Sequence, residues 1–322
     1  METIEPTISA IKAARQLLAR YLPVSRLVAA PSLRKSADGS SVYLKLDAEL
    51  PTGSFKVRGA LWALSAQVSR GEVREVVASS TGNHGAAVAY AARLLNIKCR
   101  IFLPAKANPV KRKRIADTGA TVVEDGADIV VAWDMAADYA AKQGAFFLND
   151  ATDPDVPAGP GTIACEILEQ LPSVGTIVVP MGDTALIRGM AAATRQLAPA
   201  VRVIGVQAET ASAYYLSWKE GKAINTDTCD TIADGLATRR AVPDNVRAIR
   251  SLLADVRLVS DAALLRAIKR LIIDEHVVAE PAGAASTAAW TEMPAPEGRS
   301  DVALLVSGAN ITVDTLKKAL DT

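Results

Sequence analysis

The chain has 322 residues, and its 36 Lys and Arg residues against 35 Asp and Glu residues leave a formal net charge of +1. This balance excludes a general electrostatic attraction to nucleic acid or to an acidic membrane surface. Hydrophobic residues make up 50% of the chain and charged residues 22%, which excludes a disordered chain. The length allows two globular domains, or one large domain with an added lobe.

Short apolar runs alternate with longer alanine-rich stretches along the first half of the chain. The runs predict strands, and the longer stretches between them predict helices. In chain order we expect a strand at 42–46, a helix at 55–68, a strand at 75–79, a helix at 84–95, a strand at 99–103, a helix at 109–117, a strand at 121–124, a helix at 128–142 and a strand at 145–148.

The second half of the chain repeats this alternation. We expect helices at 163–170, 185–196, 262–275 and 316–320, and strands at 176–180, 201–206, 256–259 and 303–306. The alternation predicts an α/β fold in which parallel sheets are covered by helices on both faces.

Two stretches depart from the alternation, and a third stretch is unusually basic. Residues 149–161 are polar and rich in Pro and Gly, and they are long enough to form a linker or a functional loop. Residues 225–245 show only weak periodicity. The basic run at 111–114 lies within a predicted helix, and the balanced total charge favours a solvated helix face there.

The histidines, the cysteines and the N-terminus bear on metal binding and compartment. His84 and His276 are too far apart to predict a histidine-rich metal site. Cys99, Cys165 and Cys229 show no Cys-x-x-Cys spacing, which fits a reducing compartment. The N-terminus lacks the features of a signal peptide, and no uncharged apolar run is long enough for a membrane span. We therefore expect a cytoplasmic protein without a membrane partner.

Lys56 lies in the segment PTGSFKVRG (51–59), after a glycine turn and at the start of a predicted helix. A lysine in this position is either a surface residue or a nucleophile that forms a Schiff base with a carbonyl cofactor. This segment alone leaves both interpretations open.

The segment SSTGNHG (79–85) joins a predicted strand to a predicted helix. Backbone N–H groups at the start of a helix bind anions, and side-chain hydroxyls and amides add hydrogen-bond donors. Ordinary N-capping by one Ser or Thr is the simpler explanation. Three hydroxyls, an amide and two glycines exceed what one cap requires, so we expect this segment to bind a carboxylate or a phosphate.

Two further glycine-containing segments follow predicted strands. Residues 180–189 (PMGDTALIRG) do not match the dinucleotide pattern G-x-G-x-x-G. Their backbone N–H groups suit a single phosphate, although Asp183 is an unfavourable neighbour for a dianion. The segment SGAN (307–310) is either a plain turn or presents a hydroxyl to a ligand at the carboxyl edge of the sheet.

Together these segments resemble the fold-type II pyridoxal-phosphate enzymes, and among them the serine/threonine dehydratases and serine racemases. The resemblance runs in order from about Leu22 to Thr312, through PTGSFKVRGA, SSTGNHGAAVAYAA, the loop 182–189, TIADGLA (231–237), AEPAGAAS (279–286) and SGAN. It implies the tryptophan synthase β-like fold, with two lobes that each contain a twisted, mostly parallel sheet covered by helices. We expect a large phosphate-binding domain (1–49 and 150–322), a small mobile domain with the Schiff-base lysine (50–149), and a homodimer.

The resemblance also implies the cofactor pyridoxal 5′-phosphate and roles for the matching residues. Lys56 would form the Schiff base and move the Cα proton, with Ser80 and Thr81 as further catalytic residues. The substrate carboxylate would bind Ser80, Thr81, Asn83 and His84. The cofactor would contact Phe55, Lys56, Asn83, Gly182, Asp183, Thr184, Ala185, Leu186, Gly235, Glu280 and Ser307.

Ser307 bears on the type of reaction that the resemblance implies. A neutral hydroxyl opposite the pyridine nitrogen does not force a proton onto the ring, so the ring is a weaker electron sink than it would be beside a carboxylate. This favours prompt loss of a β leaving group over transamination. Lys56 would take the α-proton, the β-hydroxyl would leave with help from the cofactor phosphate, and hydrolysis would release a 2-oxo acid and ammonia.

The phosphate loop departs from the family, which usually has a run of glycines there. Here the loop reads Gly182-Asp183-Thr184-Ala185. Either the carboxylate of Asp183 points away or only its N–H serves the phosphate, and Thr184 is a candidate for an added hydroxyl donor. The departure bears on cofactor affinity.

Two other departures bear on racemisation and on metal binding. Thr81 stands where racemases have the Ser that acts as an acid on the second face of the substrate. Because Thr is β-branched and stiff at χ1, we expect elimination to be favoured over racemisation. Gln207 and Ala213 stand where the acidic pair of a divalent-metal site would lie, so we expect no metal.

We therefore expect a lyase that dehydrates and deaminates a β-hydroxy amino acid such as L-threonine, L-serine or 3-hydroxyaspartate. Three alternatives stay open. They are a dehydratase of the ectoine or hydroxyectoine utilisation type acting on a less common amino acid, a serine or aspartate racemase, and a non-catalytic protein that binds pyridoxal phosphate.

Overall fold

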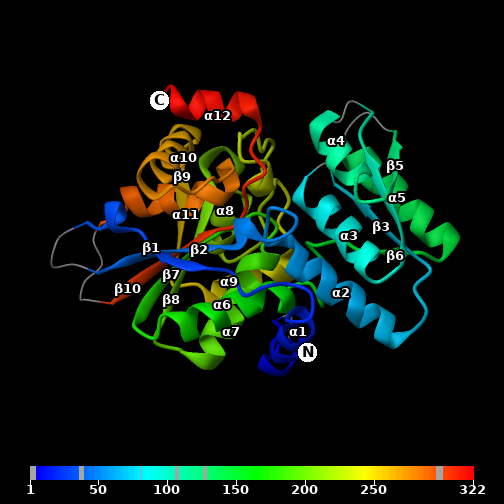
Figure 1. Cartoon of the computed structure of the whole chain (residues 1–322), viewed down its shortest axis with the longest axis horizontal. Coiled ribbons are helices and arrows are strands. Elements are labelled where there is room, and N and C mark those ends of the chain that lie inside the picture. The colour runs from blue at the N-terminus through cyan, green and yellow to red at the C-terminus, as the bar shows by residue number, and fades with distance from the viewer. Residues whose placement is uncertain (1–4, 36–39, 81, 106–108, 126–128, 295–299) are drawn as a thin grey trace.

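The computed structural model describes residues 5–35, 40–80, 82–105, 109–125, 129–294 and 300–322. These residues form two separate sheets of mostly parallel strands, and the two lobes lie side by side along the long axis of the molecule (Figure 1). The α/β class that the strand–helix alternation predicts is confirmed.

The larger sheet consists of six strands: β1 (Leu27–Ala29), β2 (Val42–Leu46), β7 (Val174–Pro180), β8 (Arg202–Ala208), β9 (Asp255–Val259) and β10 (Asp301–Val306). Their order across the sheet is β1-β2-β10-β7-β8-β9. β1 pairs antiparallel with β2, and each other pair of neighbours is parallel. The N-terminal part of the chain therefore forms one edge of a sheet whose other strands come from the second half.

The smaller sheet consists of four strands: β3 (Glu75–Ser79), β4 (Lys98–Leu103), β5 (Thr121–Glu124) and β6 (Phe146–Phe147). Their order is β5-β4-β3-β6, and all neighbours are parallel. Because every strand runs in the same direction, the carboxyl ends of all four strands lie at one edge of this sheet.

Helices connect the strands and cover both sheets. They are α1 (Ile8–Leu18), α2 (Lys56–Arg70), α3 (Asn83–Leu94), α4 (Pro109–Ala116), α5 (Ile129–Gln143), α6 (Ala158–Gln170), α7 (Ala185–Leu197), α8 (Ala213–Glu220), α9 (Pro243–Leu252), α10 (Asp261–Glu275), α11 (Pro281–Glu292) and α12 (Val313–Leu320). None of these helices is both long and apolar enough, over its described residues, to cross a membrane. On α4, Arg112 and Lys113 are exposed, as expected for a solvated helix face.

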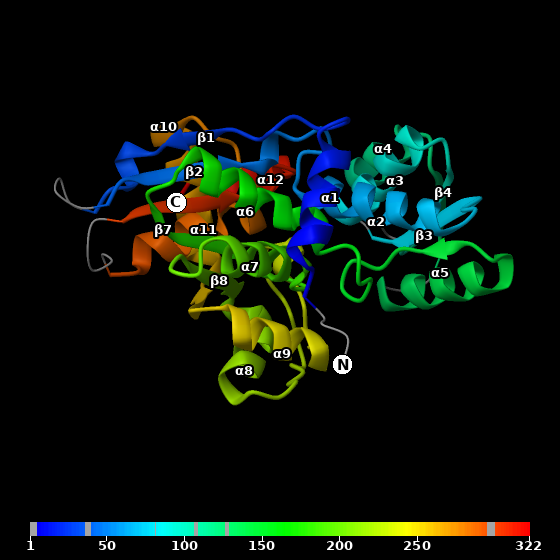
Figure 2. The ribbon, with the colours of Figure 1, turned by 90° about the horizontal axis from the view of Figure 1, so that it is seen from below.

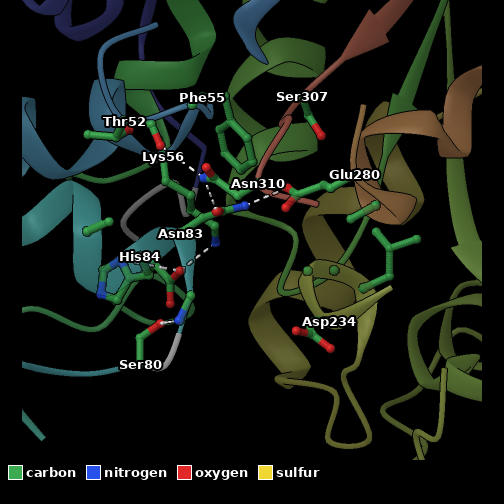
Figure 3. Close-up of a pocket in the computed structure, with 18 of the residues that line it drawn as sticks. Thr52, Phe55, Lys56, Ser80, Asn83, His84, Asp234, Glu280, Ser307 and Asn310 are labelled. Atoms are coloured by element: carbon green, nitrogen blue, oxygen red, sulfur yellow. Dashed lines mark hydrogen bonds and ion pairs between the residues drawn. The ribbon is translucent and has the colours of Figure 1, made fainter. Parts of the chain in front are cut away.

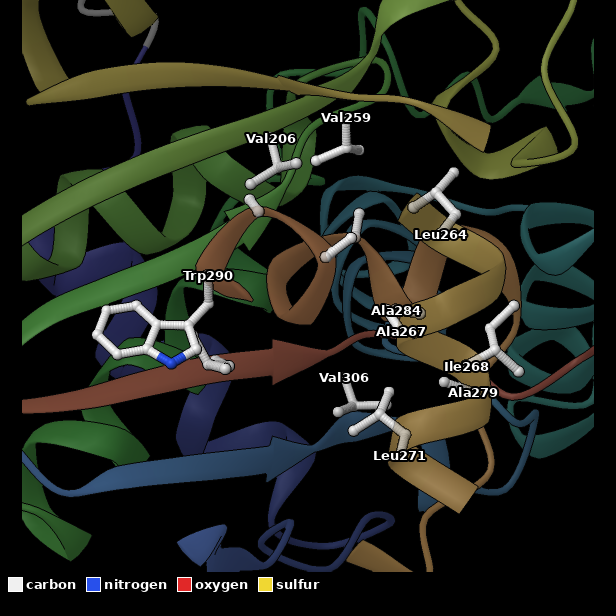
Figure 4. Packing of buried hydrophobic residues seen from close by; sticks show 14 of the residues in the cluster. Val206, Val259, Leu264, Ala267, Ile268, Leu271, Ala279, Ala284, Trp290 and Val306 are labelled. Atoms are coloured by element: carbon white, nitrogen blue, oxygen red, sulfur yellow. The ribbon is translucent and has the colours of Figure 1, made fainter. Parts of the chain in front are cut away.

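Successive residues of the central strands point into different hydrophobic clusters on the two faces of the larger sheet. On β10, Val302, Leu304 and Val306 pack with α10 and α11, a cluster that Figure 4 shows from close by. Ala303 and Leu305 pack instead with residues of α6 and α7. Burial on both faces explains why the sequences of these strands are continuous apolar runs.

The smaller sheet is covered in the same way. Val76 and Ala78 of β3 pack with residues of α2 and α3, whereas Val77 packs with residues of α5 on the opposite face (Figure 2). The first helix of this lobe, α2, begins at Lys56. The position of that lysine therefore depends on how α2 packs against the smaller sheet.

A buried charge cluster (Ser25, Lys45, Asp47, Arg58 and Glu166) joins the start of α2 to β2 and α6. Arg58 is 2% exposed and contacts Asp47 at 2.8 Å and Glu166 at 2.6 Å. The fully buried Lys45 contacts the same Glu166 at 2.6 Å, and the hydroxyl of Ser25 donates to Asp47 at 2.6 Å. Each buried charge has an opposite partner, which is the condition under which charges remain in a protein core.

Several elements differ from the sequence-based expectation. The expected loop at 149–161 ends at Pro157, because α6 begins at Ala158 and Pro160 lies in its first turn, where the missing N–H has no partner inside the helix. α11 is not predicted by the sequence, because ten of its twelve residues are buried and it shows no alternation of polar and apolar faces. The structure also contains α1, β1, α8 and α9, which the strand–helix alternation does not predict.

Candidate active site

One pocket of about 1080 Å³ lies where loops from both lobes meet. The segments that follow β3, β7 and β10 form part of its wall, as expected where the carboxyl ends of parallel strands come together. Figure 3 shows several of its side chains. Of the residues that the sequence analysis assigns to the site, those lining this pocket are Phe55, Lys56, Ser80, Asn83, His84, Gly182, Asp183, Leu186, Gly235, Glu280 and Ser307.

The turn before Lys56 is hydrogen-bonded to the segment that follows β10. The N–H of Phe55 donates to the carbonyl oxygen of Ser307 at 2.9 Å. The N–H of Ala309 donates to the carbonyl oxygen of Gly53, also at 2.9 Å. Gly53 has a φ of +68°, a left-handed conformation that glycine adopts without a Cβ clash. These bonds bring Lys56 and Ser307 to the same end of the pocket.

Asn83 is the first residue of α3, and its amide lies between two polar side chains of the other lobe (Figure 3). Asn310 Nδ2 donates to Asn83 Oδ1 at 2.7 Å, and Asn83 Nδ2 donates to Glu280 Oε1 at 2.6 Å. Asn310 Nδ2 also donates to the carbonyl oxygen of Thr52 at 2.9 Å. Segments that are far apart in the sequence thus orient the Asn83 amide.

The loop between β7 and α7 carries the predicted phosphate-binding residues. A Cβ at Gly182 would lie only 2.2 Å from the carbonyl oxygen of Gly235, so this close approach requires glycine. Thr184 caps α7 with a φ of +79°. Because the first N–H groups of a helix have no partners inside the helix, this loop presents donors to an anion.

We expect Gly182→Ala to weaken cofactor binding and to lower activity by about 10²-fold, because the new Cβ would displace the carbonyl group of Gly235. Titration of the cofactor-free protein with pyridoxal phosphate, followed by absorbance, measures the first effect. Gly71→Ala is the matched control, because no atom lies within 4 Å of its added Cβ. Equal cofactor affinity in the two variants would contradict the role assigned to this loop.

Two carboxylates contact the amine of Lys56. Asp150 Oδ2 lies 2.5 Å from Nζ, and Asp183 Oδ2 lies 2.6 Å from it. Burial lowers the pKa of Lys56, but the charges of Asp150 and Asp183 outweigh burial and raise that pKa above its ordinary value. Lys56 is therefore an ammonium group at neutral pH in this structure.

His84 on α3 lies beside Asp150. Its Nε2 lies 2.9 Å from the carbonyl oxygen of Leu148, and because a carbonyl only accepts, Nε2 carries a proton. The other ring nitrogen, Nδ1, lies 3.4 Å from Asp150 Oδ2. Burial raises the pKa of Asp150, but the neighbouring His84 and Lys56 outweigh burial and lower that pKa, so Asp150 is ionised at neutral pH.

Arg188 is a buried cation behind the phosphate loop, with 3% of its surface exposed. Its Nε donates to Thr184 Oγ1 at 3.2 Å, and its Nη2 donates to the carbonyl oxygen of Ala151 at 3.3 Å. Burial lowers the pKa of Arg188, and the charge of Asp183 opposes that shift. Arg188 thus adds a positive charge that offsets Asp183 near the expected phosphate position.

Two residues of the expected phosphate loop do not line the pocket. Thr184 and Ala185 are buried, and the Thr184 hydroxyl accepts a hydrogen bond from Arg188, so their contact with the cofactor stays a prediction. The carboxylate of Asp183 does not point away from the pocket, because one oxygen contacts Lys56 and the other accepts the N–H of Ala185 at 3.0 Å. A cation and the start of a helix both attract this carboxylate. Thr81 lies outside the described residues.

The residues expected to replace a metal-binding acidic pair have other partners or positions. Gln207 is fully buried on β8, and its Oε1 accepts the N–H of Tyr215 at 2.8 Å. Ala213 is the first residue of α8. Within the described part of the chain, no group of three or more His, Cys, Asp and Glu side chains is arranged to hold a metal ion. The lack of a metal requirement stays a prediction.

Three residues of this site were not predicted from the sequence: Asp150, Arg188 and Asn310. Asp150 follows β6 and begins the polar segment that is long enough for a functional loop, so its position at the carboxyl edge of a sheet was the available signal. Arg188 carried no signal, because a charged residue within a predicted helix is normally expected on its solvated face. Asn310 belongs to the quoted SGAN segment, but its contact with Asn83 depends on the fold.

These residues fit pyridoxal phosphate. Lys56 supplies a primary amine inside the pocket, Gly182 and Leu186 line it beside the start of α7, where helix N–H groups would attract an anion, and the neutral Ser307 lies at the end of β10. Asp183 is an unfavourable group, since its Oδ1 takes an N–H that a phosphate would use. The buried Arg188 is a nearby positive charge that opposes it.

Comparisons with known proteins agree with this fit. The model of the pyridoxal-phosphate-dependent enzyme family matches residues 20–308. The chain is 34% identical over 315 residues to L-threonine ammonia-lyase of Thermotoga maritima, an alignment that covers 98% of this chain and 78% of that protein. Its fold is similar to maize serine racemase, with a TM-score of 0.91, 28% identity and coverage of 98% of this chain and 97% of that one. It is also similar to the processed form of threonine deaminase isoform 2 from Solanum lycopersicum, with a TM-score of 0.89, 26% identity and coverage of 98% and 89%.

Proposed function

Because the chain belongs to the pyridoxal-phosphate-dependent enzyme family, we propose that it dehydrates and deaminates a β-hydroxy amino acid: L-threonine, L-serine or 3-hydroxyaspartate. The observation that carries the proposal is the shared pocket, which is lined by Lys56, by the loop at the start of α7 and by Ser307. The relative named L-threonine ammonia-lyase, at 34% identity, supports the same class of reaction.

The proposed chemistry assigns a separate task to each part of the pocket. Bound pyridoxal phosphate supplies an electron sink for the pair left behind when the Cα–H bond breaks. Lys56 takes the Cα proton, and donors around Ser80 and Asn83 hold the substrate carboxylate. The β-hydroxyl would then leave as water with a proton that the cofactor phosphate supplies, as the resemblance implies, and the released unsaturated amine would take up water to yield a 2-oxo acid and ammonia.

Ser307 supports elimination over transamination. It is 4% exposed and lies at the end of β10, where it supplies a neutral hydroxyl rather than a carboxylate. As the resemblance implies, this hydroxyl would face the ring nitrogen of bound pyridoxal phosphate, and a neutral group would not hold a proton there. Electrons released at Cα are then stored less effectively, which favours early departure of the β-hydroxyl.

The proposed domain division places the two halves of the site on different lobes. Lys56, Asn83 and His84 fall in the small domain (50–149), whereas Gly182 and Ser307 fall in the large one (1–49 and 150–322). Closure of the small domain on the substrate would exclude water and bring the carboxylate donors into contact. The homodimer stays a prediction from the family resemblance, and the cytoplasmic location stays a prediction from the N-terminal sequence and the cysteines.

A panel of amino acids tests the proposed function. We expect the purified holoenzyme to absorb at roughly 410–420 nm, as a lysine-bound cofactor does, and to release a 2-oxo acid from at least one of L-threonine, L-serine and 3-hydroxyaspartate. We also expect EDTA to leave the rate unchanged, because Gln207 and Ala213 supply no carboxylate for a divalent metal. Loss of activity in EDTA that Mg²⁺ or Ca²⁺ restores would contradict the metal prediction.

The same panel separates the alternatives. Conversion of L-serine or L-aspartate to the D enantiomer without 2-oxo acid would identify a racemase, an outcome motivated by the similarity to maize serine racemase. Activity only on amino acids derived from ectoine or hydroxyectoine would identify a dehydratase of the ectoine or hydroxyectoine utilisation type. Cofactor absorbance without any conversion would indicate a non-catalytic binding protein.

A further inference from the structure

Two carboxylates hold the amine that the proposed reaction uses. Asp150 and Asp183 contact Lys56 Nζ at 2.5 and 2.6 Å, which is the range of strong, charge-assisted hydrogen bonds. The side chains of Lys56, Asp150 and Asp183 are only 14%, 18% and 21% exposed. Because water screens these charges weakly, the two contacts are stronger than ion pairs on an open surface.

Buried donors position the backbone beside both aspartates. The carbonyl oxygen of Ala151, next to Asp150, accepts Arg188 Nη2 at 3.3 Å and Asn245 Nδ2 at 3.1 Å. Asn245 Nδ2 also lies 3.4 Å from the carbonyl oxygen of Asp183. We call Asp150 and Asp183 the acidic pair. Arg188 and Asn245 are each 3% exposed, so buried side chains fix the backbone next to this pair.

Other charged side chains near Lys56 contact other groups in this region. His84 of α3 faces Asp150 at 3.4 Å, and Arg188 of α7 lies behind the loop of Asp183. Glu280, which precedes α11, contacts the amide of Asn83. Asp150 and Asp183 are the two charged groups in ion-pair contact with Nζ among the described residues, and both stabilise a proton on it.

We infer that Asp150 and Asp183 stabilise Lys56 in its ammonium form when it takes the Cα proton, and so strengthen it as the base of the reaction. The inference rests on the proposed function. In this step the Cα–H bond breaks, its electron pair remains on the substrate side, and the proton binds the neutral amine of Lys56. The two preorganised carboxylates stabilise the positive charge that develops on Nζ in a pocket with little water.

The acidic pair has the opposite effect on cofactor loading. An ammonium group is not a nucleophile, so Lys56 must lose a proton before it attacks the carbonyl group of pyridoxal phosphate. Burial lowers the pKa of Lys56, but Asp150 and Asp183 raise it further than burial lowers it, so they keep the reactive amine scarce at neutral pH. Removing one carboxylate should speed loading and slow Cα–H cleavage, whereas a purely structural defect would slow both.

Asp150→Asn provides the main test, because this side chain lies outside the phosphate loop and the amide retains a similar shape. Cofactor-free protein is mixed with pyridoxal phosphate, and the growth of absorbance at roughly 410–420 nm is followed across pH. We expect loading about 10-fold faster at neutral pH, with the pH profile displaced toward lower pH, as for a shift of about one pKa unit. We expect kcat to fall about 10-fold or more, KM to change little, and the isotope effect of an α-deuterated substrate to increase.

Asp155→Asn is the matched control in the same loop, because Asp155 pairs with the exposed Arg70 rather than with Lys56. It should change neither loading nor kcat. Unchanged loading and kcat in Asp150→Asn, or a decrease in both rates, would overturn the inference. Asp183→Asn is expected to change both rates in the same directions as Asp150→Asn.

The loading measurement requires only Lys56 and the cofactor, so it tests the acidic pair even if no amino acid of the panel is a substrate. An accelerated loading step without any lyase activity would reject the proposed function and retain the effect of the pair on Lys56. Lyase activity with unaltered loading and unaltered isotope effects in Asp150→Asn would retain the proposed function and reject the effect of the pair on Lys56.

Discussion

Lys56→Ala is expected to lower lyase activity by about 10⁴-fold or more and to abolish the absorbance of the lysine-bound cofactor. Lys56 is the amine that lines the pocket next to Asp150 and Asp183, at the start of α2. Its removal eliminates both the covalent link to the cofactor and the base for the Cα proton. Release of 2-oxo acid and the absorbance spectrum of the purified variant measure the two losses.

Two further variants separate this chemistry from charge balance and from general damage. Lys56→Arg retains a positive charge beside the two carboxylates but cannot form the imine, because a guanidinium stays protonated. It should lose as much activity as Lys56→Ala. Lys98→Ala changes an exposed lysine at the start of β4 and should retain activity. Full activity in Lys56→Ala would refute the mechanism.

Arg58→Ala is expected to lower the free energy of unfolding by about 3–5 kcal/mol, since it leaves buried carboxylates without their main partner. Arg58 contacts Asp47 through Nε and Nη2, and Glu166 through Nη1 and Nη2. Urea denaturation of wild type and variant at neutral pH measures the difference. Lys45 contacts only one oxygen of Glu166, so it does not replace the arginine.

The effect of Arg58→Ala should decrease in acid. Burial raises the pKa of Glu166, but the charges of Arg58 and Lys45 outweigh burial and lower that pKa. A carboxylate whose folded-state pKa is lowered contributes stability above its unfolded pKa and loses that contribution as the pH falls through the folded value. The stability difference between wild type and Arg58→Ala should therefore shrink below the ordinary range of glutamate titration.

A surface pair provides the control for this prediction. The side chains of Arg15 and Glu169 are 37% and 59% exposed, and exposed pairs contribute about 0–1 kcal/mol. Arg15→Ala should therefore change the free energy of unfolding much less than Arg58→Ala does. Similar values for the two variants would mean that the buried charge cluster is not a main source of stability.

Local patterns were sufficient to predict the elements that carry most of the site. The apolar run of β3 followed by Ser80, Asn83 and His84 predicts a strand, a turn and a helix, and the structure places these three residues in the pocket. The glycine turn before Lys56 likewise predicts the start of a helix, and the structure places Lys56 at the start of α2 and in the pocket. These features are local because strand burial, helix starts and glycine turns depend on neighbouring residues.

Local patterns failed where a helix or a charge is buried on all sides. α11 lies among α10, β7 and β10 and has no polar face, so its sequence shows no helical period. Arg188 carries a charge, and charged helix residues ordinarily face solvent, yet only 3% of its surface is exposed. In both cases packing by elements that are distant in sequence determines the environment.

The sequence alone determined the α/β class, the amine of Lys56 and the segments that resemble a pyridoxal-phosphate enzyme. Only the tertiary structure decided which charges contact that amine. Asp150 lies 94 residues from Lys56 in the chain and Asp183 lies 127 residues from it, yet both contact Nζ. The physical reason is the strand order of the two sheets. Burial of both faces of each sheet brings distant strands together, and the loops at their carboxyl ends converge on one pocket.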